Sequence, residues 1–171
     1  FPSDSDWVFQ NPYTDRTFMR TMLAMEFSNN MGYYSPRTRF VELFVNEDGG
    51  QVGGPNSDDY KGVYVIMEKI KRGDDRVNIE KLSPSDITEP DISGGYIIRH
   101  DKNREEDNFW SWAGRWYYVE PSDTEITLEQ KNYIQGYISD FEQVLLGQNF
   151  SDPVTGYAQY IDIDSFIVND F

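Results

Sequence analysis

Apolar residues recur at three- and four-residue spacing in two long stretches of the chain, and this spacing predicts amphipathic helices. The first stretch runs from Arg16 to Asn30, follows Asp15 and precedes Gly32, which is typical of a helix that ends at a glycine. The second begins at Thr127, where the four residues TLEQ form a capping-box pattern, and ends before Gly147. Both segments are therefore expected to be helical.

Four shorter segments alternate between apolar and polar positions and predict strands. The connection between the first two, NEDGGQVGGPNSDDYK, is rich in Gly, Asn and Asp and predicts a long exposed loop between antiparallel partners. Its acidic residues lack the spacing of a helix-flanked calcium loop, so metal binding there is the less favoured interpretation. We expect an α+β fold, with an antiparallel sheet of at least four strands and flanking helices. The predicted strands are Arg39–Asn46, Gly62–Ile70, Gly95–His100 and Arg115–Glu120.

The last twelve residues, Tyr160–Phe171, predict a further helix that starts at a cap formed by Asp162 or Asp164. Because this helix is unfinished, we interpret residues 1–171 as a single α+β unit of a longer protein. Its apolar helix faces would then pair with the rest of that protein or with a second copy. The sequence as given begins at Phe1 and contains no run of 18 apolar residues, so it predicts neither a signal peptide nor a membrane span.

Composition excludes several kinds of chemistry. The chain has no Cys and a single His, which rules out disulfides, thiolate zinc sites and a histidine-based catalytic triad within it. Its net charge of −15 disfavours nucleic acid as a partner. The charge is uneven, because residues 16–104 hold 13 basic and 14 acidic residues while residues 105–171 hold 2 basic and 13 acidic.

An anionic ligand such as a nucleotide would therefore be expected to meet the balanced middle of the chain. A solvated surface of mixed charge explains the same counts equally well. The basic side chains available there are Arg99, Lys102, Lys69, Lys71, Arg72 and Arg76, with Arg20 and Lys61 as weaker candidates.

Five segments in order along the chain, between Trp7 and Phe166, carry the most specific pattern. The most distinctive is YKGVYVIMEKI, a glycine-aromatic strand that contains Glu68, followed at a distance by GGYIIRHDK. The others are DWVFQNPYTDRTFMRTMLA, GYYSPRTRFVELFVN and YIDIDSFI. Together they resemble the CotH kinase family of spore coat proteins and their secreted bacterial relatives.

The resemblance implies the N-terminal lobe of an atypical protein-kinase-like domain that uses ATP with Mg or Mn. It also implies transfer of phosphate to Ser of coat or extracellular proteins, and a secreted or cell- or spore-surface location. In such proteins the catalytic and metal-binding aspartates follow the position where this chain stops. We therefore assign no catalytic residue and no metal ligand here, and we interpret Asp162, Asp164 and Asp170 as residues of a helix start.

The same resemblance places Arg99 where many relatives carry Lys, so Arg99 is predicted to contact the nucleotide phosphates. Arg is not equivalent to Lys in this role, because its planar fork differs from a compact ammonium. Glu68 is predicted to pair with Arg99 and orient it, since a carboxylate in an apolar strand is costly to bury unmatched. The alternative is a solvent-facing Glu68 on an edge strand.

Two further interpretations concern the aromatic segment that follows. Residues Tyr117–Glu120 precede Pro121 and the capped helix, the place where a kinase hinge would offer backbone groups to adenine. The aromatic residues of NFWSWAGRWYY are interpreted mainly as packing residues. If exposed, they would instead suit a non-catalytic extracellular module that binds protein or carbohydrate.

Overall fold

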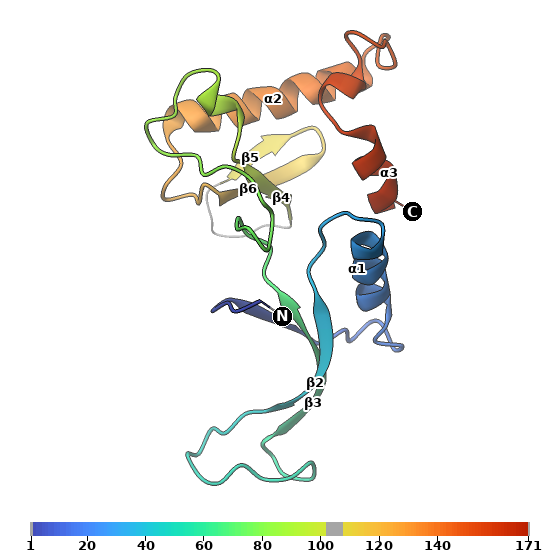
Figure 1. Ribbon diagram of the computed structural model, residues 1–171, viewed down its shortest axis with the longest axis vertical. Coiled ribbons are helices and arrows are strands. Elements are labelled where there is room, and N and C mark those ends of the chain that lie inside the picture. The colour runs from blue at the N-terminus through green and yellow to red at the C-terminus, as the bar shows by residue number, and fades with distance from the viewer. Residues whose placement is uncertain (1, 102–107, 171) are drawn as a thin grey trace. The chain divides into compact units, whose positions relative to one another are not determined.

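The computed structural model describes residues 2–101 and 108–170, of which residues 168–170 are described by their backbone alone. The chain divides into two compact units, an N-terminal unit of residues 1–70 and a C-terminal unit of residues 71–171 (Figure 1). Each unit contains one antiparallel sheet of three strands, and the described residues form three α-helices in all. The fold is thus α+β, as predicted.

The sheet of the N-terminal unit has its longest strand in the middle. Its order is β1-β3-β2, with β1 at Trp7–Gln10, β2 at Thr38–Phe44 and β3 at Tyr60–Glu68. The side chain of Val65 in β3 is fully buried. Helix α1, at Arg20–Asn30, lies against β2. The long loop between β2 and β3 leaves the sheet as the sequence predicted (Figure 1).

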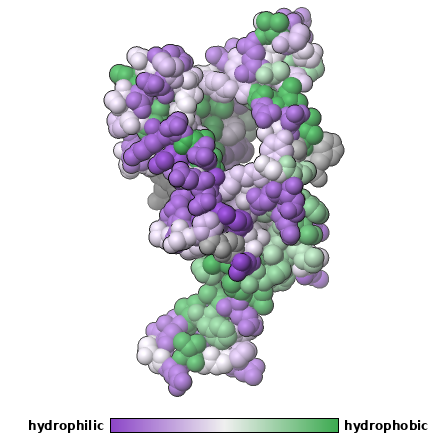
Figure 2. Space-filling model, in the orientation of Figure 1, coloured by the Kyte–Doolittle hydropathy of each residue, from purple (hydrophilic) through white to green (hydrophobic). Residues whose placement is uncertain are grey.

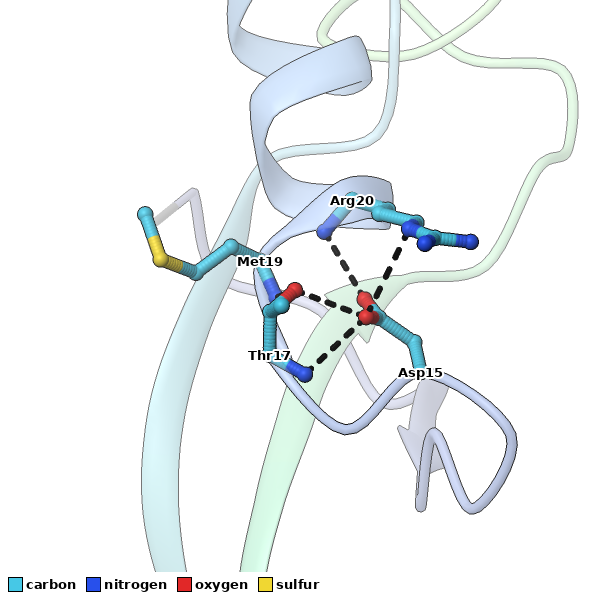
Figure 3. A network of polar contacts seen from close by, with 4 residues as sticks. All are labelled: Asp15, Thr17, Met19 and Arg20. Carbon is cyan, nitrogen blue, oxygen red and sulfur yellow. Dashed lines mark hydrogen bonds and ion pairs between the residues drawn. The ribbon is translucent and has the colours of Figure 1, made fainter.

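Helix α1 begins four residues later than the sequence predicted, because Asp15 organises a turn in front of it (Figure 3). One carboxylate oxygen of Asp15 accepts hydrogen bonds from the Thr17 hydroxyl at 2.7 Å and the Thr17 N–H at 3.1 Å. The other accepts from the Arg20 N–H at 2.9 Å. Phe18 takes a left-handed φ of 60° within this turn. The hydrogen bond from the Thr17 hydroxyl is the largest of the contributions that lower the pKa of Asp15.

The C-terminal unit packs a second sheet against one long helix. Its strand order is β4-β6-β5, with β4 at Ile97–His100, β5 at Asn108–Ser111 and β6 at Gly114–Glu120. Helix α2, at Leu128–Leu146, covers one face of this sheet (Figure 1). The core between them consists of Phe109, Tyr118, Ile126 and Ile134, with Tyr96, Ile98, Trp116 and Ile138 packed around it.

The capping box predicted at the start of α2 is confirmed. The Thr127 hydroxyl accepts from the Gln130 N–H at 3.3 Å, and the Gln130 side chain accepts from the Thr127 N–H at 3.1 Å. Gln130 is also fully buried, and its amide nitrogen donates to the carbonyl oxygens of Ser83 at 2.7 Å and Asp86 at 3.2 Å. This residue therefore ties the loop before β4 to the helix, which the sequence pattern did not predict.

The last helix, α3, spans Ile163–Asp170, and its start matches one of the two predicted caps. Asp162 precedes it and accepts from the Ser165 hydroxyl at 2.7 Å and the Asp164 N–H at 3.1 Å. These bonds lower the pKa of the Asp162 carboxyl, that from Ser165 most. Short 3₁₀ helices occur at Asp91–Ser93 and Tyr157–Gln159.

The prediction of one sheet with at least four strands is wrong, because the predicted strands belong to two sheets. Each sheet is completed by a strand that the sequence did not reveal, β1 or β5, and both are only four residues long, too short to show alternation. The expectation that residues 1–171 act as a single domain stays a prediction.

Hydrophobic residues reach the surface in both units, and Figure 2 shows such a region around β2 and β3. Among the described residues, none of the helices has the length and apolar character needed to span a bilayer. Pairing through apolar helix faces with a second copy stays a prediction. Exposed apolar side chains include Val8, Phe9, Phe40 and Val63 in the first unit and Leu145, Leu146, Phe166 and Ile167 in the second.

Replacing Gln130 should destabilise the protein more than removing its capping partner. Gln130→Ala removes the side-chain acceptor of the capping box and also the donor that serves two loop carbonyls, for an expected loss of about 2 kcal/mol. Thr127→Ala removes only the cap and should cost about 1 kcal/mol. Chemical denaturation of the two variants checks this order, and an equal loss would show that the loop contacts contribute nothing.

Candidate functional site

Glu68 is buried at the end of the central strand β3, with 1% of the residue exposed. Its Oε1 lies 2.8 Å from Nε of Arg37, and its Oε2 accepts from the Arg37 backbone N–H at 3.1 Å. The Glu68 N–H in turn donates to the Arg37 carbonyl at 3.3 Å. The alternative of a solvent-facing Glu68 on an edge strand is therefore wrong.

Arg37 is the site residue that sequence reasoning missed. It immediately precedes β2, and its side chain stays 39% exposed while its Nε meets the buried carboxylate. The strand pairing explains the contact: Thr38 lies opposite Met67, so continuing the antiparallel pairing by one residue brings Arg37 opposite Glu68. Extending the two predicted strands by their register would have brought this pair together.

Arg99 lies in β4 of the C-terminal unit, where its guanidinium carbon is 5.4 Å from the ring centre of Tyr117. Arg99 and Tyr117 are directly opposite each other on neighbouring strands, and Tyr117 is fully buried. The aromatic face favours the cation and limits its movement. Since Glu68 belongs to the other unit, its pairing with Arg99 stays a prediction.

A hollow of about 240 Å³ lies where β6 leads into α2. Its lining includes Leu82, Gly95, Glu120, Pro121 and Thr124. The hollow lies at the connection that the sequence suggested as a hinge for adenine. The volume of the hollow falls just below the usual range of ligand pockets. Within the predicted hinge, Tyr117 and Tyr118 are buried, so their rings serve as packing residues.

Comparison with known proteins gives one match. A family model described as CotH kinase protein matches residues 1–169, almost the entire chain. The chain belongs to the CotH kinase family. This confirms the resemblance that the five ordered segments carried. No curated protein and no solved structure matches the chain.

Three of the remaining basic candidates of this CotH family chain make local contacts. Arg76 is buried and donates to the Asp75 carbonyl at 3.2 Å. Arg20 forms an ion pair with Asp15 at 3.7 Å, and Lys61 forms one with Glu47 at 3.9 Å. These two pairs fit the interpretation of Arg20 and Lys61 as surface charges. Lys102 lies outside the described residues.

CotH kinases use ATP with a divalent metal in general, and such a metal needs a cluster of acidic ligands. Within residues 2–101 and 108–170, no group of three or more His, Asp or Glu residues is placed to hold a metal ion. The described residues therefore do not fit a divalent ion, and no chemical step is assigned to one here.

The two members of the Arg37–Glu68 pair should contribute unequally to stability. Arg37→Ala removes the guanidinium from a buried carboxylate and should cost about 3 kcal/mol. Glu68→Gln leaves a neutral acceptor next to a half-exposed guanidinium that water can solvate, and should cost about 1 kcal/mol. Thermal unfolding of both variants tests this order, and a larger loss for Glu68→Gln would contradict it.

Proposed function

We propose that this CotH-like, kinase-related chain is the nucleotide-binding part of a protein kinase that transfers phosphate from ATP to Ser residues of coat or extracellular proteins. The observation that carries this proposal is the family match over residues 1–169. The match also favours it over a purely non-catalytic binding or scaffold module. A secreted or cell- or spore-surface location belongs to the same proposal.

Phosphoryl transfer depends mainly on positioning the triphosphate and neutralising its charge. In this proposal Arg99 binds phosphate oxygens with its guanidinium fork, which can make two parallel hydrogen bonds. Support comes from the contact with Tyr117, because a guanidinium that is already positioned loses less conformational freedom on binding.

Glu68 is proposed to orient the phosphate-binding cation. The support is its burial and its demonstrated bond to a guanidinium, that of Arg37, which shows that the carboxylate can hold such a group in place. Arg37 itself, with a half-exposed side chain, is a second cation that the same carboxylate orients. Arg99 would reduce the repulsion that the phosphates present to an attacking hydroxyl.

A divalent metal, Mg or Mn, supplies further charge neutralisation across the phosphates in kinases. The acidic residues that hold it and the catalytic aspartate are proposed to lie in sequence encoded after Phe171. Reading that sequence tests the point directly. An aspartate-bearing helix followed by a Trp-Asp-x-Asp-like motif is expected, whereas a stop codon or an unrelated module would contradict it.

Replacing Arg99 should abolish ATP binding. In the complete encoded protein, Arg99→Ala is expected to remove the heat of ATP binding in calorimetry, because the phosphates lose their bidentate partner. Arg99→Lys should retain weakened binding, since it keeps the charge but not the fork. Arg39→Ala, at an exposed position of β2, serves as the matched control and should bind ATP normally.

Glu68→Gln tests the orienting role of Glu68 separately from the phosphate-binding role of Arg99. Weaker ATP binding in this variant supports an orienting role for the carboxylate. Normal binding, together with loss in Arg99→Ala, would refute the role of Glu68 and leave that of Arg99. Unchanged affinity in Arg99→Ala would refute the nucleotide site itself.

A further inference from the structure

A groove of about 580 Å³ is lined by the β5–β6 hairpin on one side and by α2 on the other, within the C-terminal unit. This volume lies in the range of small-molecule binding sites. Nothing in the proposed nucleotide site uses the groove. Its lining includes Ser111 and Trp112 of the hairpin and Asn132, Gln135, Ser139 and Glu142 of the helix.

The hairpin side of the groove is held rigid by Glu142. This carboxylate is buried, and it accepts from the backbone N–H groups of Trp112 at 2.9 Å and Ala113 at 3.0 Å. Burial acts to raise the pKa of Glu142, but hydrogen bonds from the Ser111 hydroxyl and these two N–H groups outweigh it and lower the pKa. The carboxylate is thus ionised at neutral pH and fixes the turn.

Trp112 is an exposed residue of that fixed turn, with 74% of its surface open to solvent. The turn positions its backbone while the indole remains available at the groove. A large planar apolar ring in this setting contributes nothing to the core. It is instead typical of a contact surface, where a planar face and an N–H donor are both useful.

The helix side of the groove is kept open by Gly136. Glycine in a helix interior costs about 0.5–1 kcal/mol relative to Ala. Here no neighbour requires it, because a Cβ added at Gly136 would meet no atom within 4 Å. Its backbone is helical and needs no left-handed φ. Packing within the fold therefore does not require a glycine here, whereas a side chain much larger than Ala at this position would extend into the groove.

Uncharged polar side chains complete the helix side. Asn132 and Ser139 are exposed and seven residues apart, so they lie on the same side of α2 two turns apart. Gln135 lies between them and donates to the Tyr118 hydroxyl at 2.7 Å. Of the lining residues that the structure describes, Glu142 alone is charged, and its carboxylate already accepts the bonds that hold the turn.

We propose that this groove binds a saccharide, with a sugar face on the indole of Trp112 and sugar hydroxyls on Asn132 and Ser139. An aromatic plane beside amide and hydroxyl groups matches a neutral ligand that has apolar faces and many hydroxyls. Among the described residues of the lining, the one charged group is a carboxylate, which favours a neutral ligand over a phosphorylated one.

The test titrates three probes, the hexasaccharides of β-1,4-glucose, β-1,4-N-acetylglucosamine and α-1,4-glucose, into the full chain. Binding is followed by tryptophan fluorescence and calorimetry. At least one probe is expected to bind, and Trp112→Ala should lower its affinity about tenfold, with partial recovery in Trp112→Phe. Tyr13→Ala removes an even more exposed aromatic ring from the other unit and should leave affinity unchanged.

A matched pair at Gly136 tests the groove independently of the tryptophan. Gly136→Leu fills the open space and should remove binding, whereas Gly136→Ala adds one methyl group and should largely keep it. Both replacements should raise thermal stability, since glycine is the poorer helix former. A loss of binding in Gly136→Leu therefore cannot be attributed to unfolding.

Three outcomes would overturn the proposal. The first is that none of the three hexasaccharides binds. The second is that a sugar binds but Trp112→Ala and Gly136→Leu leave its affinity unchanged. The third is that a Ser-rich peptide occupies the groove while none of the sugars binds. ATP binding by the same variants should be unaffected, which distinguishes failure of this site from failure of the nucleotide site.

Discussion

A glutamate carboxylate that leaves water loses several kcal/mol of solvation unless hydrogen bonds replace it. In each unit of this chain such a carboxylate accepts hydrogen bonds from backbone N–H groups at a place where two segments come into contact. Glu68 joins the end of β3 to the residue before β2, and Glu142 joins α2 to the β5–β6 turn. These contacts position the side chains on which both proposed sites depend.

Arginine side chains are similarly positioned by planar partners. Arg37 meets the Glu68 carboxylate, Arg99 lies over Tyr117, and Arg115 lies over Trp110 with its guanidinium carbon 4.2 Å from the ring centre. A guanidinium can stack and donate at the same time, which an ammonium cannot do as well. An Arg in place of Lys at position 99 is therefore compatible with an oriented cation, provided that a neighbouring ring supports it.

Much of the local structure could be predicted because its causes are local. The capping box at Thr127, the glycine after α2 and the alternation in β3 each depend on a few adjacent residues. The partition into two sheets could not be predicted, since it depends on which strand edges meet. The four-residue strands β1 and β5 show too little pattern to indicate a partner.

The candidate site could be predicted only in part, because some of its contacts join residues that are far apart in the sequence. The apolar strand around Glu68 left both a buried and a solvent-facing carboxylate open, and its contact with Arg37 required the register of a hairpin whose loop is long. The family resemblance rested on ordered segments rather than on any one motif, and the family match confirms it. The groove beside Gly136 could not be predicted from the sequence, because the role of a glycine within a helix depends on the residues that surround it in the structure.

The single histidine of the chain sits beside the same hairpin turn. Nε2 of His100 lies 2.9 Å from the Ala113 carbonyl oxygen, so this nitrogen carries the hydrogen in the bond. A Cβ at Gly114 would come within 2.5 Å of that nitrogen, which explains the absence of a side chain there. Because the sequence contains no other imidazole, an imidazole signal in an NMR spectrum of this chain belongs to His100 and reports on the loop that presents the exposed indole.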